Sequence, residues 1–167
     1  MSKAPPTKAT SRTTATERGS ALLVLTIALV FAISSSAVAS DLTLSTTLNK
    51  WSRTIAADAR SVSTAAKGRH PRRMTTNATR FRRDALRAQA AIAAQRSSSA
   101  TGGRAKALAL RAFASYAMAG KRWAASGRAR LAHRKPWASA LAHSAGAFAG
   151  RGNRLLVMAG TLLSSHT

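Results

Sequence analysis

The segment Leu44–Ala65, LSTTLNKWSRTIAADARSVSTA, decides the fold of this chain. Its apolar residues follow one another at alternating intervals of four and three, the spacing of one face of an α-helix. This face consists of Leu44, Leu48, Trp51, Ile55, Asp58, Val62 and Ala65. We therefore expect a long amphipathic helix whose apolar face packs against other helices, with one carboxylate on that face.

The same spacing returns after Gly68–Pro71, where Gly and Pro predict a break. The second predicted helix has an inward face of Met74, Ala78, Phe81, Ala85, Ala88 and Ile92. Ser97–Gly103 is predicted to be a flexible turn, and a third helix to run from Arg104 to about Ala132. Its expected inward residues include Phe113, Ala117, Ala124 and Leu131.

A fourth helix is expected after Lys135-Pro136, because Pro136 disfavours helical backbone at Lys135. Its predicted inward face is Trp137, Leu141, Ser144, Phe148, Arg151, Leu155, Met158 and Leu162. Gly146, Gly150 and Gly152 have low helix propensity and predict a kink or break in its middle.

These patterns predict an all-α fold in which three to four Ala/Arg-rich helices pack antiparallel, since no strand-like alternation is present. The predicted inward faces are filled largely with Ala, which buries little area at roughly 25 cal/mol per Å². A close-packed bundle and a loosely ordered set of helices both agree with this composition.

The amino-terminal part has a different organisation. Residues 1–19 are polar and basic and are expected to form a disordered tail. Residues 20–40 contain no charge and are just long enough to cross a bilayer, while Ala21–Ile33 has the size of the apolar region of a signal peptide. Ala37-Val38-Ala39 fits a signal-peptidase site, so removal after Ala39 and retention as a membrane helix both stay open.

The basic residues indicate an orientation. Lys3, Lys8, Arg12 and Arg18 precede the apolar segment, and the first positive charge after it is Lys50. The positive-inside rule then places the tail in the cytoplasm. Residues 41–167 are expected on the outer side.

Charge is the dominant property of the composition. The 167 residues contain 27 Lys and Arg against four acids, a formal charge of +23, and no Cys. This imbalance predicts attraction to polyanions: anionic lipid, acidic wall polymer or nucleic acid. The excess of Arg over Lys favours bidentate contacts to phosphate or carboxylate.

Two groups of basic residues are the predicted polyanion contacts. The first is Arg69, Arg72, Arg73, Arg80, Arg82, Arg83 and Arg87, with Phe81 among them; the second is Lys121, Arg122, Arg128, Arg130, Arg134 and Lys135, beside Trp123 and Trp137. Aromatic side chains between arginines can stack on bases or lie at a lipid interface. A separate structural pair is predicted between Asp58 and Arg151, each on the inward face of its helix.

Catalytic patterns are absent from the sequence. His70, His133, His143 and His166 have no i,i+4 partner or nearby carboxylate that would complete a zinc site. Gly150-Arg151-Gly152 and Gly120-Lys121-Arg122 each lack residues that a nucleotide-binding loop requires. We expect no enzyme activity, no cofactor and no metal.

The arrangement of residues 17–66 resembles the TadE- and TadG-type proteins of Flp/Tad pilus assembly. The matching elements are Glu17-Arg18-Gly19, the apolar stretch up to Ser40, Asp41-Leu42, Ala56-Ala57-Asp58-Ala59 and Ala65-Ala66. The fifth residue after Gly19 is Val24, where pilin-like stems carry Glu, which argues against processing after Gly19. The resemblance implies a retained amino-terminal helix in a pilus-assembly or cell-surface setting, with other pilin-like subunits as partners.

The leading expectation is therefore a single-pass surface protein whose exterior helical region binds anionic lipid or wall polymer. The alternatives are a secreted polybasic protein released after Ala39 and a nucleic-acid-binding protein.

Overall fold

The computed structural model describes the backbone of residues 16–164 and the side chains of residues 40–164. The chain divides into two units, Met1–Ser35 and Ser36–Thr167, and the architecture below is that of the second. The described residues form helices and turns and no strand, which confirms the all-α prediction. The helices are α1 (Thr16–Lys67), α2 (Pro71–Ala94), α3 (Ala100–Leu131) and α4 (Lys135–Ser164).

Most of the predicted tail, residues 1–19, lies outside this range, and the backbone of the apolar segment 20–40 belongs to helix α1. Of residues 1–40, only Ser40 has a described side chain. Within the part of the chain that the structure does describe, no helix has a stretch that is both long and apolar enough to cross a bilayer.

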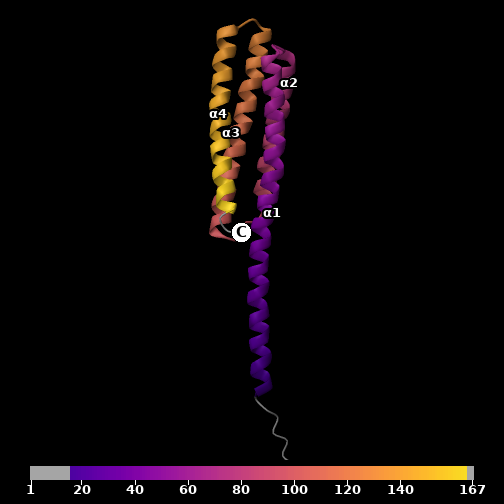
Figure 1. The fold of residues 1–167 in the computed structure, drawn as a ribbon, viewed down its shortest axis with the longest axis vertical. Coiled ribbons are helices and arrows are strands. Elements are labelled where there is room, and N and C mark those ends of the chain that lie inside the picture. Colours follow the sequence, from indigo (N-terminus) through magenta and orange to yellow (C-terminus); the bar gives the residue numbers. More distant parts are fainter. Residues whose placement is uncertain (1–15, 165–167) are drawn as a thin grey trace, which may run out of the picture. The chain divides into compact units, whose positions relative to one another are not determined.

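The carboxyl-terminal half of α1 and helices α2 to α4 lie side by side and alternate in direction (Figure 1). Helix α3 packs against both α2 and α4. The α1–α2 and α3–α4 turns consequently lie at one end of the bundle. The α2–α3 turn lies at the other end, where the side chain of Asp41 accepts a hydrogen bond from the Ser99 hydroxyl.

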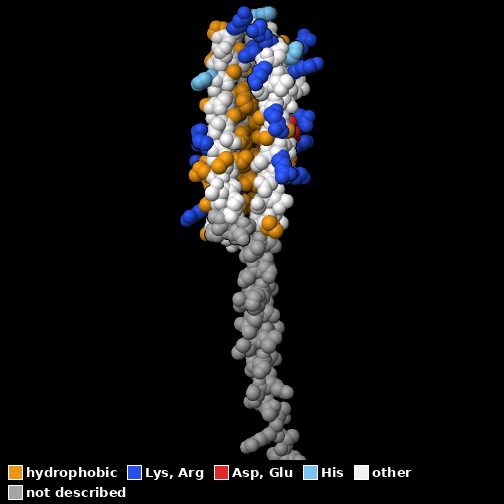
Figure 2. Space-filling model, viewed as in Figure 1, with side chains coloured by type: hydrophobic (Ala, Val, Ile, Leu, Met, Phe, Trp, Pro, Cys, Tyr) orange, Lys and Arg blue, Asp and Glu red, His pale blue; other side chains and the backbone are white. Residues whose placement is uncertain are grey.

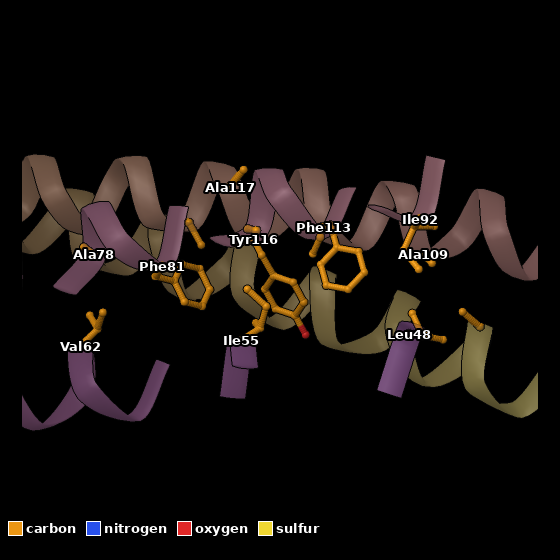
Figure 3. Packing of buried hydrophobic residues seen from close by; sticks show 14 of the residues in the cluster. Leu48, Ile55, Val62, Ala78, Phe81, Ile92, Ala109, Phe113, Tyr116 and Ala117 are labelled. Atoms are coloured by element: carbon orange, nitrogen blue, oxygen red, sulfur yellow. The ribbon is translucent and has the colours of Figure 1, made fainter. Parts of the chain in front are cut away.

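The predicted inward faces of α1 and α2 are confirmed. On α1 the face Leu44–Ala65 is buried, apart from the half-buried Trp51, and on α2 each of the six predicted residues is buried. Figure 3 shows Ile55 and Val62 of α1 pointing toward the layer that contains Phe81 and Tyr116.

Aromatic contacts supply much of the area that the alanines lack. The ring of Phe81 on α2 lies 5.9 Å from that of Tyr116 at 88° and 5.4 Å from that of Trp123 at 72°. Such edge-to-face pairs add about 0.5–1.5 kcal/mol each beyond the area they bury. The core therefore centres on a few large rings surrounded by small residues.

Helix α3 begins at Ala100, four residues before the predicted start at Arg104. Ser99 caps the helix, because its hydroxyl oxygen accepts a hydrogen bond from the Gly102 amide at 2.8 Å. Ser97–Gly103 was predicted as a turn from its Ser and Gly content, but Gly102 and Gly103 lie within the first turn of the helix. The prediction that Leu131 points inward was also wrong, since this residue is 43% exposed at the end of α3.

The predicted inward face of α4 was wrong in part: Leu141 is buried and Phe148 and Leu162 are half-buried against the core, but other predicted residues are exposed. Trp137 and Met158 are 59% and 54% exposed. Besides Leu141, the buried residues of α4 are Ala138, Ala145, Gly152, Ala159 and Leu163, which the prediction missed. Small residues at the contact let the helix backbones approach closely, and this outweighs the larger area of the side chains on the predicted face.

Glycines mark the closest approaches between helices. A Cβ atom on Gly152 of α4 would lie 2.9 Å from ring carbons of Tyr116, and one on Gly120 of α3 would lie 2.9 Å from the Arg82 amide nitrogen and 3.0 Å from the Ala78 carbonyl oxygen. Helix α4 also runs without interruption through Gly146–Gly152, so the predicted break does not occur. The bundle is close-packed, not a loosely ordered set of helices.

The substitution Gly120→Ala tests this close packing. We expect it to lower the free energy of unfolding by about 1–3 kcal/mol, because backbone atoms of α2 leave no room for a methyl group. Gly146→Ala is the matched control: no atom of another helix lies within 4 Å of the place that its Cβ would take, and it should gain up to about 1 kcal/mol from helix propensity. Thermal unfolding followed by circular dichroism measures both, and equal stability of the two variants would contradict close packing.

Candidate functional site

The fold brings parts of both predicted basic groups to the same end of the bundle. We call this the basic end and define it as Arg69, Arg72, Arg73, Arg128, Arg130, Arg134 and Lys135. Figure 2 shows Lys, Arg and His side chains gathered there. Six of the seven cations are exposed, and Arg130 is half-buried. The two groups are distant in sequence, and they meet because the two turns that carry them lie at one end.

Both turns of the basic end have the same backbone structure. The amides of Arg69 and His70 donate to the carbonyls of Ala66 and Ala65, at 3.2 and 3.0 Å. These two bonds form a Schellman motif that closes the helix. Arg69 has the left-handed conformation, with φ 54°, in a position that Gly usually occupies.

The α3–α4 turn repeats this motif. His133 and Arg134 donate to the carbonyls of Arg130 and Ala129, at 3.1 and 2.9 Å. His133 takes the left-handed position, with φ 57°. A left-handed conformation costs a residue with a side chain about 1–2 kcal/mol, so each turn carries a side chain where glycine would be less costly.

Two cavities open at or near the basic end. The first, which we call the end cavity, has a volume of about 520 Å³ and is lined by Arg69, Pro71, Arg130, Lys135, Ala138 and Ser139. The second lies between α1 and α2, has a volume of about 420 Å³ and is lined by Ala57, Arg60, Ser61, Thr64, Ala65, His70, Arg73 and Asn77. Cationic side chains line both.

The acidic residues that the structure describes lie away from the basic end. Asp41 is at the opposite end, where it also accepts a hydrogen bond from the Ser98 amide at 3.3 Å. Asp58 and Asp84 lie on the neighbouring faces of α1 and α2 and are both buried. The positive charge of the basic end is therefore not compensated by any described carboxylate nearby.

Three of the predicted polyanion contacts surround these two buried aspartates. Arg80 Nε lies 3.3 Å from Asp58 Oδ1 and 3.7 Å from Asp84 Oδ2. Arg83 Nε and an Arg87 terminal nitrogen lie 3.7 and 3.3 Å from Asp84 Oδ1. The charges of Arg80, Arg83 and Arg87 are thus partly balanced, unlike those of the basic end. Arg82, Lys121 and Arg122 lie along α2 and α3.

Asp58 pairs with Arg80 and not with the predicted partner Arg151, which is exposed on α4. The physical reason is the hairpin of α1 and α2. Asp58 and Arg80 lie equally far from Arg69 on either side, as do Ser61 and Asn77, whose carbonyl and side-chain amide are hydrogen-bonded at 3.0 Å. An antiparallel pairing centred on the turn would have identified Arg80 from the sequence.

The aromatic side chains near the basic groups have different environments. Phe81 is fully buried, and Trp123 is half-buried with its ring against that of Phe81. Phe81 cannot stack on a ligand without opening the core, and Trp123 exposes only part of its ring. Trp137, two residues after Lys135 in the sequence, is 59% exposed, so its ring can contact a ligand.

Comparison of the chain with protein-family models, with curated proteins and with solved structures gives no match. The resemblance to TadE- and TadG-type proteins stays a prediction. Among the described residues no three His, Asp or Glu side chains lie close enough to hold a metal ion.

The buried Asp58 makes stability depend on pH. Burial raises its pKa above the ordinary value, Arg80 opposes this rise, and a hydrogen bond with Asp84 adds to it. Its Oδ2 atom is buried with no hydrogen-bond partner, and the protonated acid can donate a hydrogen bond to Asp84. Because the folded state favours the neutral acid, this contribution to stability is complete below about pH 4, the ordinary Asp range, and is lost as pH rises through the folded pKa.

We expect Asp58→Asn to stabilise the protein at pH 7 by about 1 kcal/mol, since the amide supplies the missing donor and carries no charge to desolvate. The gain should fade as the pH falls toward 3, where wild-type Asp58 is itself neutral. Urea unfolding across this pH range measures the difference. Asp58→Ala is the control: it removes the partner of both Asp84 and Arg80 and should destabilise the bundle. A stabilisation by Asp58→Asn that is equal at pH 3 and pH 7 would contradict the assignment.

Proposed function

We propose that residues 40–164 form a non-catalytic module that binds an anionic polymer of the cell envelope at the basic end. The observation that carries this proposal is the meeting of seven cations from two turns and the adjoining helix ends, with the described acids elsewhere in the bundle. An uncompensated cluster of arginines attracts polyanions and provides bidentate contacts to phosphate or carboxylate.

The proposal includes location. The apolar segment 20–40 would be a membrane helix, and residues 41–167 would lie outside the cytoplasm, as the distribution of basic residues favours. The resemblance of residues 17–66 to TadE- and TadG-type proteins supports a setting in Tad pilus assembly or a related envelope structure, with pilin-like subunits as further partners.

The length of α1 favours a polymer over the lipid of the same membrane. Helix α1 rises about 40 Å between Ser40 and Lys67, at 1.5 Å per residue. The Debye length at physiological salt is about 8 Å. Lipid head groups beside Ser40 would therefore be screened from the basic end. The anions that bind the basic end would instead lie farther from the membrane, as a polymer can.

Nucleic acid is the second candidate, because exposed Trp137 beside Lys135 offers a ring for stacking. It is the weaker candidate, because Phe81 is buried in the core and Trp123 is half-buried against it. Duplex DNA is therefore included as a competitor in the binding test.

The intact mass of the native protein tests the anchoring part of the proposal. Retention of the apolar segment predicts a chain that begins at or near Met1 and needs detergent to stay in solution. A chain that begins at Ser40 would show signal-peptide removal and a secreted protein, and one that begins at Ser20 would show pilin-type processing.

Salt dependence of binding tests the basic end. The full-length chain in non-ionic detergent is titrated with poly(glycerol phosphate), with vesicles that contain phosphatidylglycerol, and with a short DNA duplex at equal phosphate concentration. The polymer should bind most tightly. Binding weakens as salt rises, so the slope of log K against log salt is negative. In the variant Arg72→Gln/Arg128→Gln/Arg134→Gln, the magnitude of this slope should decrease by about 2, at about 0.7 per lost contact to a flexible polyanion.

The matched control is Arg53→Gln/Arg96→Gln/Arg104→Gln, which removes the same charge from exposed positions outside the basic end. Its slope should change little. An equal loss in both variants would show that only net charge matters, and tighter binding of the duplex than of the polymer would favour the nucleic-acid function.

A further inference from the structure

The end cavity has the features of a small anion site. Its three cations come from three elements: Arg69 from the α1–α2 turn, Arg130 from the last turn of α3, and Lys135 from the start of α4. Its volume of about 520 Å³ lies within the usual range of small-molecule sites. The surrounding cations of the basic end add to the positive potential there.

We propose that the end cavity binds a phosphate monoester carried on a small polyol or sugar, such as the terminal unit of the polymer; this inference rests on the proposed function. Two guanidinium groups offer paired N–H donors to phosphate oxygens, Lys135 adds a mobile ammonium, and the Ser139 hydroxyl adds another donor. Three positive charges with no nearby carboxylate favour a dianion over the single charge of a diester or a carboxylate.

The rest of the cavity suits the organic part of such a ligand. A phosphate group alone would leave much of the volume empty. Pro71 and Ala138 contribute apolar wall beside the cations, against which the carbon skeleton of a polyol can lie. The ligand is thus defined by one doubly charged end and a small uncharged body.

The cavity is held in place by contacts on both sides. Ser126 of α3 is fully buried and donates to the Ala138 carbonyl of α4 at 2.7 Å, which fixes the two helices beside the cavity. The Schellman bonds hold Arg69 in its left-handed conformation. A site organised before binding loses less entropy on capturing its ligand.

The neighbouring helix starts support the same charge preference. Helices α2 and α4 begin at Pro71 and Lys135, both in the cavity wall, and neither has an acidic residue in its first turn. Helix α2 also lacks a side-chain cap. Their dipoles therefore add positive potential to that of the three cations.

The experiment titrates the full-length chain with glycerol 1-phosphate, inorganic phosphate and acetate, by isothermal calorimetry and by amide shifts of Arg72 and Ser139. We expect glycerol 1-phosphate to bind at least tenfold more tightly than acetate. The variant Arg69→Gln/Arg130→Gln/Lys135→Gln should weaken its binding at least tenfold. The equally charged variant Arg53→Gln/Arg96→Gln/Arg104→Gln, whose exposed residues lie outside the basic end, should weaken it no more than threefold. Unchanged circular dichroism and melting temperature verify that each variant is folded.

The outcomes separate this inference from the proposed function. If both variants weaken glycerol 1-phosphate binding equally, or if acetate binds as tightly, the end cavity is not a phosphate site, even where the polymer still binds the wild type. If the wild type binds glycerol 1-phosphate through the cavity but does not bind the polymer, the proposed function fails and the site stands.

Discussion

The close contact of α3 with its two neighbours is the constraint on which the bundle depends. Gly120 brings the backbone of α3 against α2, and Gly152 brings α4 against the ring of Tyr116. Alanine-rich faces bury too little area to hold helices at ordinary separation, so stability here depends on short distances between backbones and on the rings around Phe81. A larger side chain at either glycine would separate the helices along their whole contact.

This packing also decides where the positive charge can lie. Helices that pack through small residues leave no interior space for long cationic side chains, so these lie on outer faces and at the turns. Asp58 and Asp84 balance part of the charge along α1 and α2, because Arg80 reaches both. The basic end has no such balance, and mutual repulsion there opposes folding. A bound polyanion would remove that repulsion and stabilise the folded state by mass action.

Much of the fold could be predicted from the sequence where large apolar residues mark a helical face, as Leu44, Ile55 and Phe81 do. The prediction failed in part on α4 because its contact residues, such as Gly152, are small, while exposed Trp137 and Met158 look like core residues in a one-dimensional pattern. Both basic groups were visible in the sequence. Their meeting at one end depends on the antiparallel order of the helices, and the end cavity depends on the side-chain positions at two turns.

The proposed binding of a flexible polymer agrees with the small size of the basic end. The basic end is the end of a bundle of helices, each about 10 Å across, so its cations occupy a small area. A rigid duplex or a flat bilayer touches such an area over a short length, whereas a flexible polymer can bend to reach cations at both turns.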